Sequence, residues 1–158
     1  MNTNDLKTIL EKHCLWLDNL ENGERANFTG VDLRRADLGS ANLRGACLEG
    51  ACLRSANLSG ANLKGACLEG ACLEGANLGS ANLSGANLKG ACLKGACLDG
   101  ANLYQITLCG ATIDGAVLNQ SDIGGPGHIL CALTDSEWQT ISATRAEVAL
   151  ALAKGDGK

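Results

Sequence analysis

The sequence predicts an all-β solenoid, a β-helix of about five coils with an α-helical cap at each end. First, a five-residue unit repeats twenty times in tandem from Ala26 to Gly125. Second, the apolar content is mostly Leu and Ala, with one Phe, one Tyr and one Met in 158 residues. This composition indicates a narrow interior. Third, both flanking segments place apolar residues at helical spacing.

The unit reads small residue, polar residue or Cys, Leu, variable residue, Gly or Ser. Its first and third positions are two apart, so both side chains point to one face of a short extended segment. Gly at the fifth position tolerates the backbone angles of a corner. The predicted core is the third position, which is occupied by Phe28, Leu33, Leu38, Leu43, Leu48, Leu53, Leu58, Leu63, Leu68, Leu73, Leu78, Leu83, Leu88, Leu93, Leu98, Leu103, Leu108, Ile113, Leu118 and Ile123.

The sequence leaves two registers open for the stacking of these units. Residues 41–60 match 61–80 at 15 of 20 positions, which favours a shift of twenty. Residues 61–80 match 86–105 at 16 of 20 positions, which favours twenty-five. Because four right-angle corners close a square, we expect four units to form one coil.

Units such as Ala41-Asn42-Leu43-Arg44-Gly45 are similar to those of the pentapeptide-repeat family, and the resemblance covers about two-thirds of the chain. It implies a right-handed quadrilateral β-helix with Leu and Ala inward and the other three positions outward. Some members of that family imitate duplex DNA and bind a type II topoisomerase. In some members a helical C-terminal module forms a dimer.

The repeats divide the chain into residues 1–25, 26–125 and 126–158. An open β-helix exposes unpaired strand edges, and we expect a helix to cover each end. Residues 5–19 predict the N-terminal helix, and residues 134–137 have the form of a capping box that begins the C-terminal one. The faces expected to pack inward hold Leu6, Ile9, Leu10, His13 and Leu17 in the first helix, and Trp138, Ile141, Arg145, Val148 and Leu152 in the second.

Net charge and hydropathy exclude several partners. The formal charge is −4, so a strong electrostatic footprint for nucleic acid or an anionic membrane is missing. No basic segment followed by an apolar run opens the sequence. We therefore expect an unexported, cytoplasmic bacterial protein that binds neither nucleic acid nor membrane. Its nine cysteines are expected to be reduced thiols.

Candidate catalytic residues are few. His13 and His128 are the only histidines, and neither has a nucleophile and carboxylate pattern around it. Asp32 and Asp37 could serve as an outward carboxylate pair, as in enzymes built on parallel β-helices, but isolated solvated acids are far more common. We expect no enzymatic activity, no cofactor and no metal.

The second position of the unit is most often Asn or Cys. Stacked cysteines would lie about 4.8 Å apart, farther than the roughly 3.8 Å between β-carbons of a relaxed disulfide. A flat ladder also fails to surround zinc, so Cys is interpreted as a small substitute for Asn. Stacked amides can hydrogen-bond along the rod. A register of twenty aligns two cysteine columns and one largely asparagine column: Cys52, Cys72 and Cys92; Cys47 and Cys67; Asn42, Asn62, Asn82, Asn102 and Asp122.

The repeat region carries eight acids and seven bases, so it is nearly neutral. A register of twenty also alternates charge sign down the column Arg54, Glu74, Lys94 and Asp114.

The sequence therefore favours a monomeric, non-enzymatic scaffold for a protein partner that it does not identify. A DNA-mimicking topoisomerase modulator is the alternative, and a β-helix enzyme is a weaker one. The predicted contact surface consists of unusual corner residues and an exposed aromatic: Arg35, Gln105, Gln120 and Tyr104.

Overall fold

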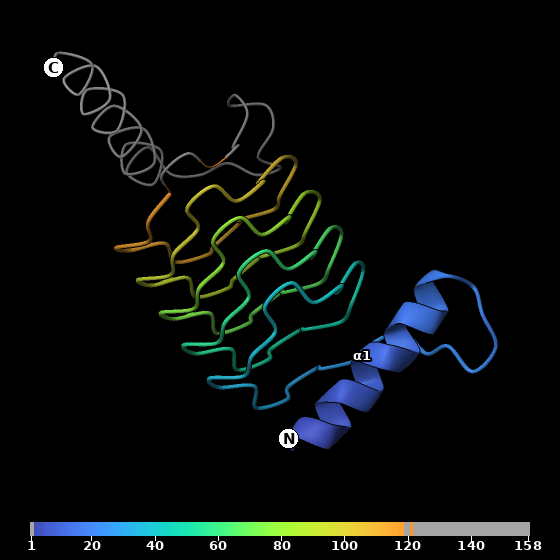
Figure 1. Cartoon of the computed structure of the whole chain (residues 1–158). Coiled ribbons are helices and arrows are strands. Elements are labelled where there is room, and N and C mark those ends of the chain that lie inside the picture. Colours follow the sequence, from blue (N-terminus) through green and yellow to red (C-terminus); the bar gives the residue numbers. More distant parts are fainter. Residues whose placement is uncertain (1, 119–120, 122–158) are drawn as a thin grey trace, which may run out of the picture.

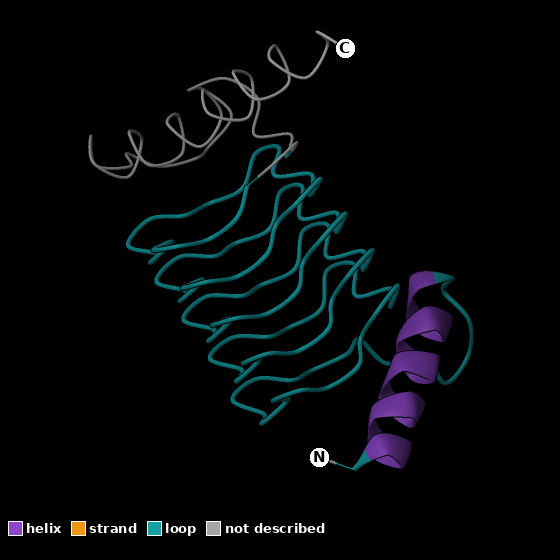
Figure 2. Cartoon of the chain, turned by 60° about the vertical axis from the view of Figure 1, so that its left-hand side comes forward, coloured by secondary structure: helices purple, strands orange, loops and turns teal. Residues whose placement is uncertain are grey.

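In the computed structural model, which describes residues 2–118 and 121, the chain winds into a stack of coils (Figure 1). Parallel bridges join second-position residues that are twenty positions apart, from Asn27–Cys47 to Cys97–Val117. Four units therefore make one turn, and the alternative shift of twenty-five is wrong. The coils pair through single-residue bridges instead of long strands, because each unit turns after three residues. For this reason Figure 2 draws the coils as loops.

This register gives the stack four faces, which we number by the unit that begins each one. The first coil is residues 26–45, and its four units start the first, second, third and fourth faces in chain order. Further coils span 46–65, 66–85 and 86–105, and residues 106–118 continue the stack. A residue thus lies directly above the residue twenty positions earlier.

Two kinds of backbone hydrogen bond hold the coils. Between coils, the Phe28 amide donates to the Cys47 carbonyl at 2.7 Å, and the Cys47 amide donates to the Ala26 carbonyl at 3.0 Å. Within a coil, the Ala36 amide donates to the Leu33 carbonyl at 3.0 Å and closes a four-residue turn. The same pattern recurs in successive units, so each corner and each face repeats its geometry.

The fifth residue of every unit from Gly30 to Gly115 has a positive φ, between 54° and 68°. A positive φ at the third residue of a four-residue turn is the mark of a type II turn, for which Gly is the preferred residue. Arg35 and Gln105 adopt this left-handed conformation with φ of 57° and 56°, although they carry a Cβ.

The third-position side chains line the interior of the stack. From Phe28 to Leu118 they are all buried, with 0–7% of each residue exposed. First-position alanines fill the remaining space, and Ile106 is buried among them at 1% exposure. Ile123, the last predicted core residue, lies outside the described residues.

Helix α1 spans Thr3–Leu17 and lies at the N-terminal end of the stack (Figures 1 and 2). The Asn2 side chain caps it by accepting from the Asp5 amide at 2.8 Å. Leu6, Ile9 and Leu10 pack against the buried core. The helix therefore begins two residues earlier than the sequence predicted. The second predicted helix, at residues 134–152, lies outside the described residues.

Candidate interaction surface

The carboxylates considered for catalysis are both engaged. Asp32 forms an ion pair with Arg34 at 2.5 Å, and hydrogen bonds from the Arg34 side chain, then from its backbone, lower the pKa of Asp32 to about 2. Asp37 accepts from the Asn57 side chain at 2.8 Å and from the Gly39 amide at 3.2 Å. A general acid needs a raised pKa. Asp32 has the opposite shift, which does not suit it to the role of a general acid.

His13 is fully buried and closes the junction between α1 and the first coil. Its Nδ1 accepts a hydrogen bond from the Ala26 amide at 3.1 Å. In later units the first-position amide donates to the Leu carbonyl of the preceding unit, and His13 takes the place of that carbonyl. Burial, the largest cause, lowers the pKa of His13; the Arg44 backbone opposes this shift and the charge of Arg25 adds to it. The imidazole is therefore a structural acceptor. His128 lies outside the described residues.

Second-position Asn side chains hold their own corners. The Asn62 Oδ1 accepts from the Lys64 amide at 3.2 Å, and the Asn82 Oδ1 accepts from the Ser84 amide at 3.0 Å. The amide of the fourth residue takes no part in the bonds between coils, so this local bond satisfies it. On the fourth face, turns are therefore stabilised by the side chains of Asn42, Asn62, Asn82 and Asn102. Within residues 2–118, these side chains bond to their own corners and not to one another, so the predicted amide ladder is wrong for this column.

The residues predicted for partner contact do not form one surface. Arg35 lies at the corner between the second and third faces of the first coil. Tyr104 and Gln105 lie on the fourth face, three coils away along the rod. Tyr104 is 40% exposed. Gln120 lies outside the described residues.

A stripe of fourth-position side chains runs along the fourth face, and we call Arg44, Lys64, Ser84 and Tyr104 the fourth-face stripe. Backbone bonds of 2.8–2.9 Å, such as Gly45 amide to Lys64 carbonyl, hold successive coils of this face in register. Arg44 and Lys64 are exposed, and neither forms an ion pair within the described part of the chain. The four units of this face contain no Asp or Glu in residues 41–45, 61–65, 81–85 and 101–105, so its charge is positive.

Trp16 extends this stripe toward α1. A hollow of about 470 Å³ is lined by Trp16, Arg44 and Lys64, together with Leu17, Asn19, Gly45 and Gly65. The Trp16 ring stacks on His13 with a centroid distance of 5.5 Å, yet 39% of the residue is exposed. The sequence analysis missed Trp16; the signal was its place just outside the apolar face of the helix.

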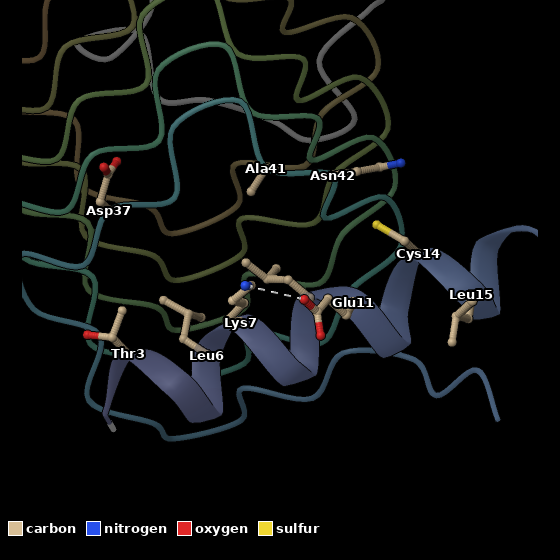
Figure 3. A pocket seen from close by; sticks show the side chains of 10 residues that line it. Thr3, Leu6, Lys7, Glu11, Cys14, Leu15, Asp37, Ala41 and Asn42 are labelled. Carbon is tan, nitrogen blue, oxygen red and sulfur yellow. Dashed lines mark ion pairs between the residues drawn. The ribbon is translucent and has the colours of Figure 1, made fainter.

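A second hollow, of about 720 Å³, lies between α1 and the first coil (Figure 3). Leu6, Leu10 and Ala41 give it a largely apolar lining, and the Lys7–Glu11 ion pair at 3.8 Å lies at its helix side. The helix therefore covers the first coil only partly, which leaves Ala41 half-buried.

Two acidic side chains on the other faces are neutralised by bases on an adjacent coil. Arg54 pairs with Glu74 at 3.2 Å on the second face, as the predicted charge alternation requires. Lys89 pairs with Glu69 at 3.3 Å on the first face. These pairs break up any continuous negative surface on the two faces.

Coils of four pentapeptides, an aliphatic interior and left-handed corners define the class of protein as a four-sided β-solenoid. The sequence model described as pentapeptide repeats matches residues 24–60, 48–79 and 73–105, just over half of the chain. The chain belongs to the pentapeptide-repeat family, which implies a right-handed quadrilateral β-helix. No curated protein matches the chain.

Several solved structures are similar to the chain. HetL from the cyanobacterium Nostoc sp. strain PCC 7120, a pentapeptide repeat protein involved in heterocyst differentiation regulation, is 36% identical with a TM-score of 0.37; the match covers 63% of this chain and half of HetL. A pentapeptide repeat protein of the Arabidopsis thaliana thylakoid lumen is 28% identical over 75% of this chain and 72% of its own, with a TM-score of 0.41. QnrB1, a plasmid-mediated fluoroquinolone resistance protein, is 18% identical over 71% of this chain and 64% of its own, with a TM-score of 0.40. At these TM-scores the likeness supports no inference about function.

No helix within residues 2–118 is long and apolar enough to cross a membrane.

Proposed function

We propose that the protein is a non-enzymatic scaffold that binds an extended acidic segment of a partner protein along the fourth-face stripe. The observation that carries this proposal is the uncompensated positive charge of Arg44 and Lys64 between two exposed aromatic residues, Trp16 and Tyr104. Arg and aromatic side chains are enriched at protein interfaces, and complementary charge steers a partner to them.

The proposed architecture matches such a role. Helix α1 lies over the first coil and partly covers its strand edges, which hinders the stack from extending into a fibre at that end. The protein acts as a monomer in the cytoplasm. A molar mass by light scattering that is independent of concentration tests the monomer.

The binding proposal is tested with the full chain as bait in its native host, with quantitative mass spectrometry. Charge reversal at Arg44→Glu with Lys64→Glu should release the partner, and added salt should weaken its capture. Lys94→Glu is the matched control, because Lys94 is a fourth-position lysine on the second face. Equal capture by both variants would contradict the assignment of the surface.

Topoisomerase modulation by DNA mimicry is the second candidate. It requires an extended negative surface, whereas the ion pairs of Glu69 and Glu74 and the charge of the fourth-face stripe reduce that potential. Supercoiling by purified gyrase should therefore be unchanged across an excess of this protein. Inhibition or protection of gyrase at stoichiometric amounts would favour the alternative.

A further inference from the structure

Reduced cysteines form unbroken columns on two neighbouring faces. On the second face, bridges pair Cys52 with Cys72 and Cys72 with Cys92. On the first face, Cys47 is paired with Cys67. All five are half-buried free thiols at the surface of the rod. Cys97 provides an internal comparison: it is also half-buried but lies between Asn77 and Val117 on the third face.

The fold does not account for these cysteines. Where the second position is Asn or Asp, its side chain accepts from the backbone amide two residues later, as Asn62 does from Lys64. In the described part of the second face, the amides of Arg54, Glu74 and Lys94, each two residues after a cysteine, donate no such bond to a side chain. One such bond contributes about 0.5–1.5 kcal/mol. Cysteine therefore stabilises the corner less than Asn does, so corner stability does not explain its presence in these columns.

The spacing of the columns fits one kind of ligand. Neighbouring strands lie about 4.8 Å apart, and paired side chains on them run parallel. A thiolate–zinc bond is about 2.3 Å long; on this scale, an ion midway between two sulfurs requires them to be about 4.6 Å apart. Thiolates select soft cations such as copper(I). No three His, Cys, Asp or Glu of the described residues form a possible metal cluster, so the columns offer ligands only in pairs.

We propose that the stacked cysteine pairs bind a soft monovalent cation of the copper(I) class in two-coordinate thiolate sites. One site lies between Cys47 and Cys67, and the other lies in the column of Cys52, Cys72 and Cys92. At each site two thiols release their protons to water and two sulfur–metal bonds form. No electron is transferred, and the bis-thiolate centre carries one net negative charge. Lys94 lies on the same face as the second site and offsets this charge, whereas Arg54 is already paired with Glu74.

The register makes Cys72 the decisive residue of the second face. Loss of Cys52 leaves Cys72 paired with Cys92, and loss of Cys92 leaves it paired with Cys52. Loss of Cys72 leaves Cys52 and Cys92 two coils apart, about 9.6 Å. One two-coordinate ion cannot span that distance, so only the middle substitution removes the site.

The experiment uses silver(I), a redox-inert soft cation, with the reduced full-length protein under anaerobic conditions and an excess of a monothiol competitor. Cysteines are then alkylated in the native state, and each is quantified by mass spectrometry. We expect alkylation of Cys47, Cys67 and Cys72 to slow at least about tenfold, while Cys97 reacts as it does without silver. Copper(I) should give the same pattern and an X-ray absorption spectrum with two sulfur ligands.

Serine variants complete the test, with thermal melts to show that each is folded. Cys72→Ser should lose the second-face silver ion and the protection of Cys52 and Cys92 but keep the ion between Cys47 and Cys67, whereas Cys52→Ser and Cys97→Ser should keep both sites. The proposal is overturned if silver is lost to the competitor, if Cys97 is protected like Cys72, if Cys72→Ser binds like Cys97→Ser, or if copper(I) has three or four sulfur ligands.

Discussion

Replacement of Leu68 by Ala tests the packed interior directly. Leu68 is fully buried in the third coil, and its backbone is held on both sides. The Leu68 amide donates to the Asn87 carbonyl at 2.7 Å, and the Cys67 amide donates to the Ala46 carbonyl at 3.0 Å. These bonds prevent the coil from collapsing around the missing side chain.

The expected loss follows from the removed atoms and the cavity. Three buried carbon atoms contribute about 2.4 kcal/mol at about 0.8 kcal/mol each. Buried Leu→Ala substitutions span about 2.7–5.0 kcal/mol as the cavity grows. Because the coil cannot close, we expect Leu68→Ala to lower the free energy of unfolding by about 4 kcal/mol, a large part of the roughly 5–15 kcal/mol of a typical domain.

Urea denaturation followed by circular dichroism measures this loss as a lower midpoint. Lys94→Ala on the exposed surface is the control and should change stability by no more than about 0.5 kcal/mol. Leu68→Asp should unfold the protein, since it would bury an unpaired charge. A loss below about 1 kcal/mol for Leu68→Ala, or a soluble Leu68→Asp variant with an unchanged melting curve, would refute an inward, tightly packed Leu68.

Three further predictions concern the cap and the corners. Burial lowers the pKa of His13 below 6.5, so the unfolded chain binds more protons than the folded one near this pH. The free energy of unfolding should therefore fall as the pH drops below about 6.5. Urea titrations at successive pH values should show a weaker dependence on pH for His13→Gln. Gln105→Gly should raise the melting temperature by relieving the left-handed conformation, worth up to about 1–2 kcal/mol, and a lower melting temperature would contradict that reading. Asn62→Ala should lower the free energy of unfolding by about 0.5–1.5 kcal/mol, because it removes the bond from the Lys64 amide, and Cys72→Asn should raise it by a similar amount. Urea denaturation measures both changes. An unchanged free energy of unfolding in both variants would contradict this contribution of the corner bond.

The sequence was sufficient for the features that repeat. Leu and Ala two positions apart predicted the buried interior, and the third-position residues from Phe28 to Leu118 are buried. The apolar spacing of Leu6, Ile9 and Leu10 predicted the face of α1 that packs on the core. These predictions succeed because a periodic backbone gives every copy of a position the same environment.

What depends on neighbours in three dimensions could not be predicted in the same way. Internal similarity supported shifts of both twenty and twenty-five; the square geometry favoured twenty, and the bridges confirm it. The hollow at Trp16 requires the position of α1 relative to Arg44 and Lys64, which no local pattern encodes. The Asn side chains bond to their own corners because the fourth-position amide has no partner between coils, a fact that requires the whole hydrogen-bond pattern.

The four faces differ mainly in the residues at the second and fourth positions of the five-residue unit. Every face shares the same core and the same bonds between coils, so these parts cannot distinguish one side of the rod from another. The fourth face combines an Asn column with cationic and aromatic side chains, whereas the second combines a cysteine column with paired charges. Binding to a protein and binding to a soft cation therefore use separate faces. Arg44→Glu with Lys64→Glu should leave silver binding intact, and Cys72→Ser should leave partner capture intact.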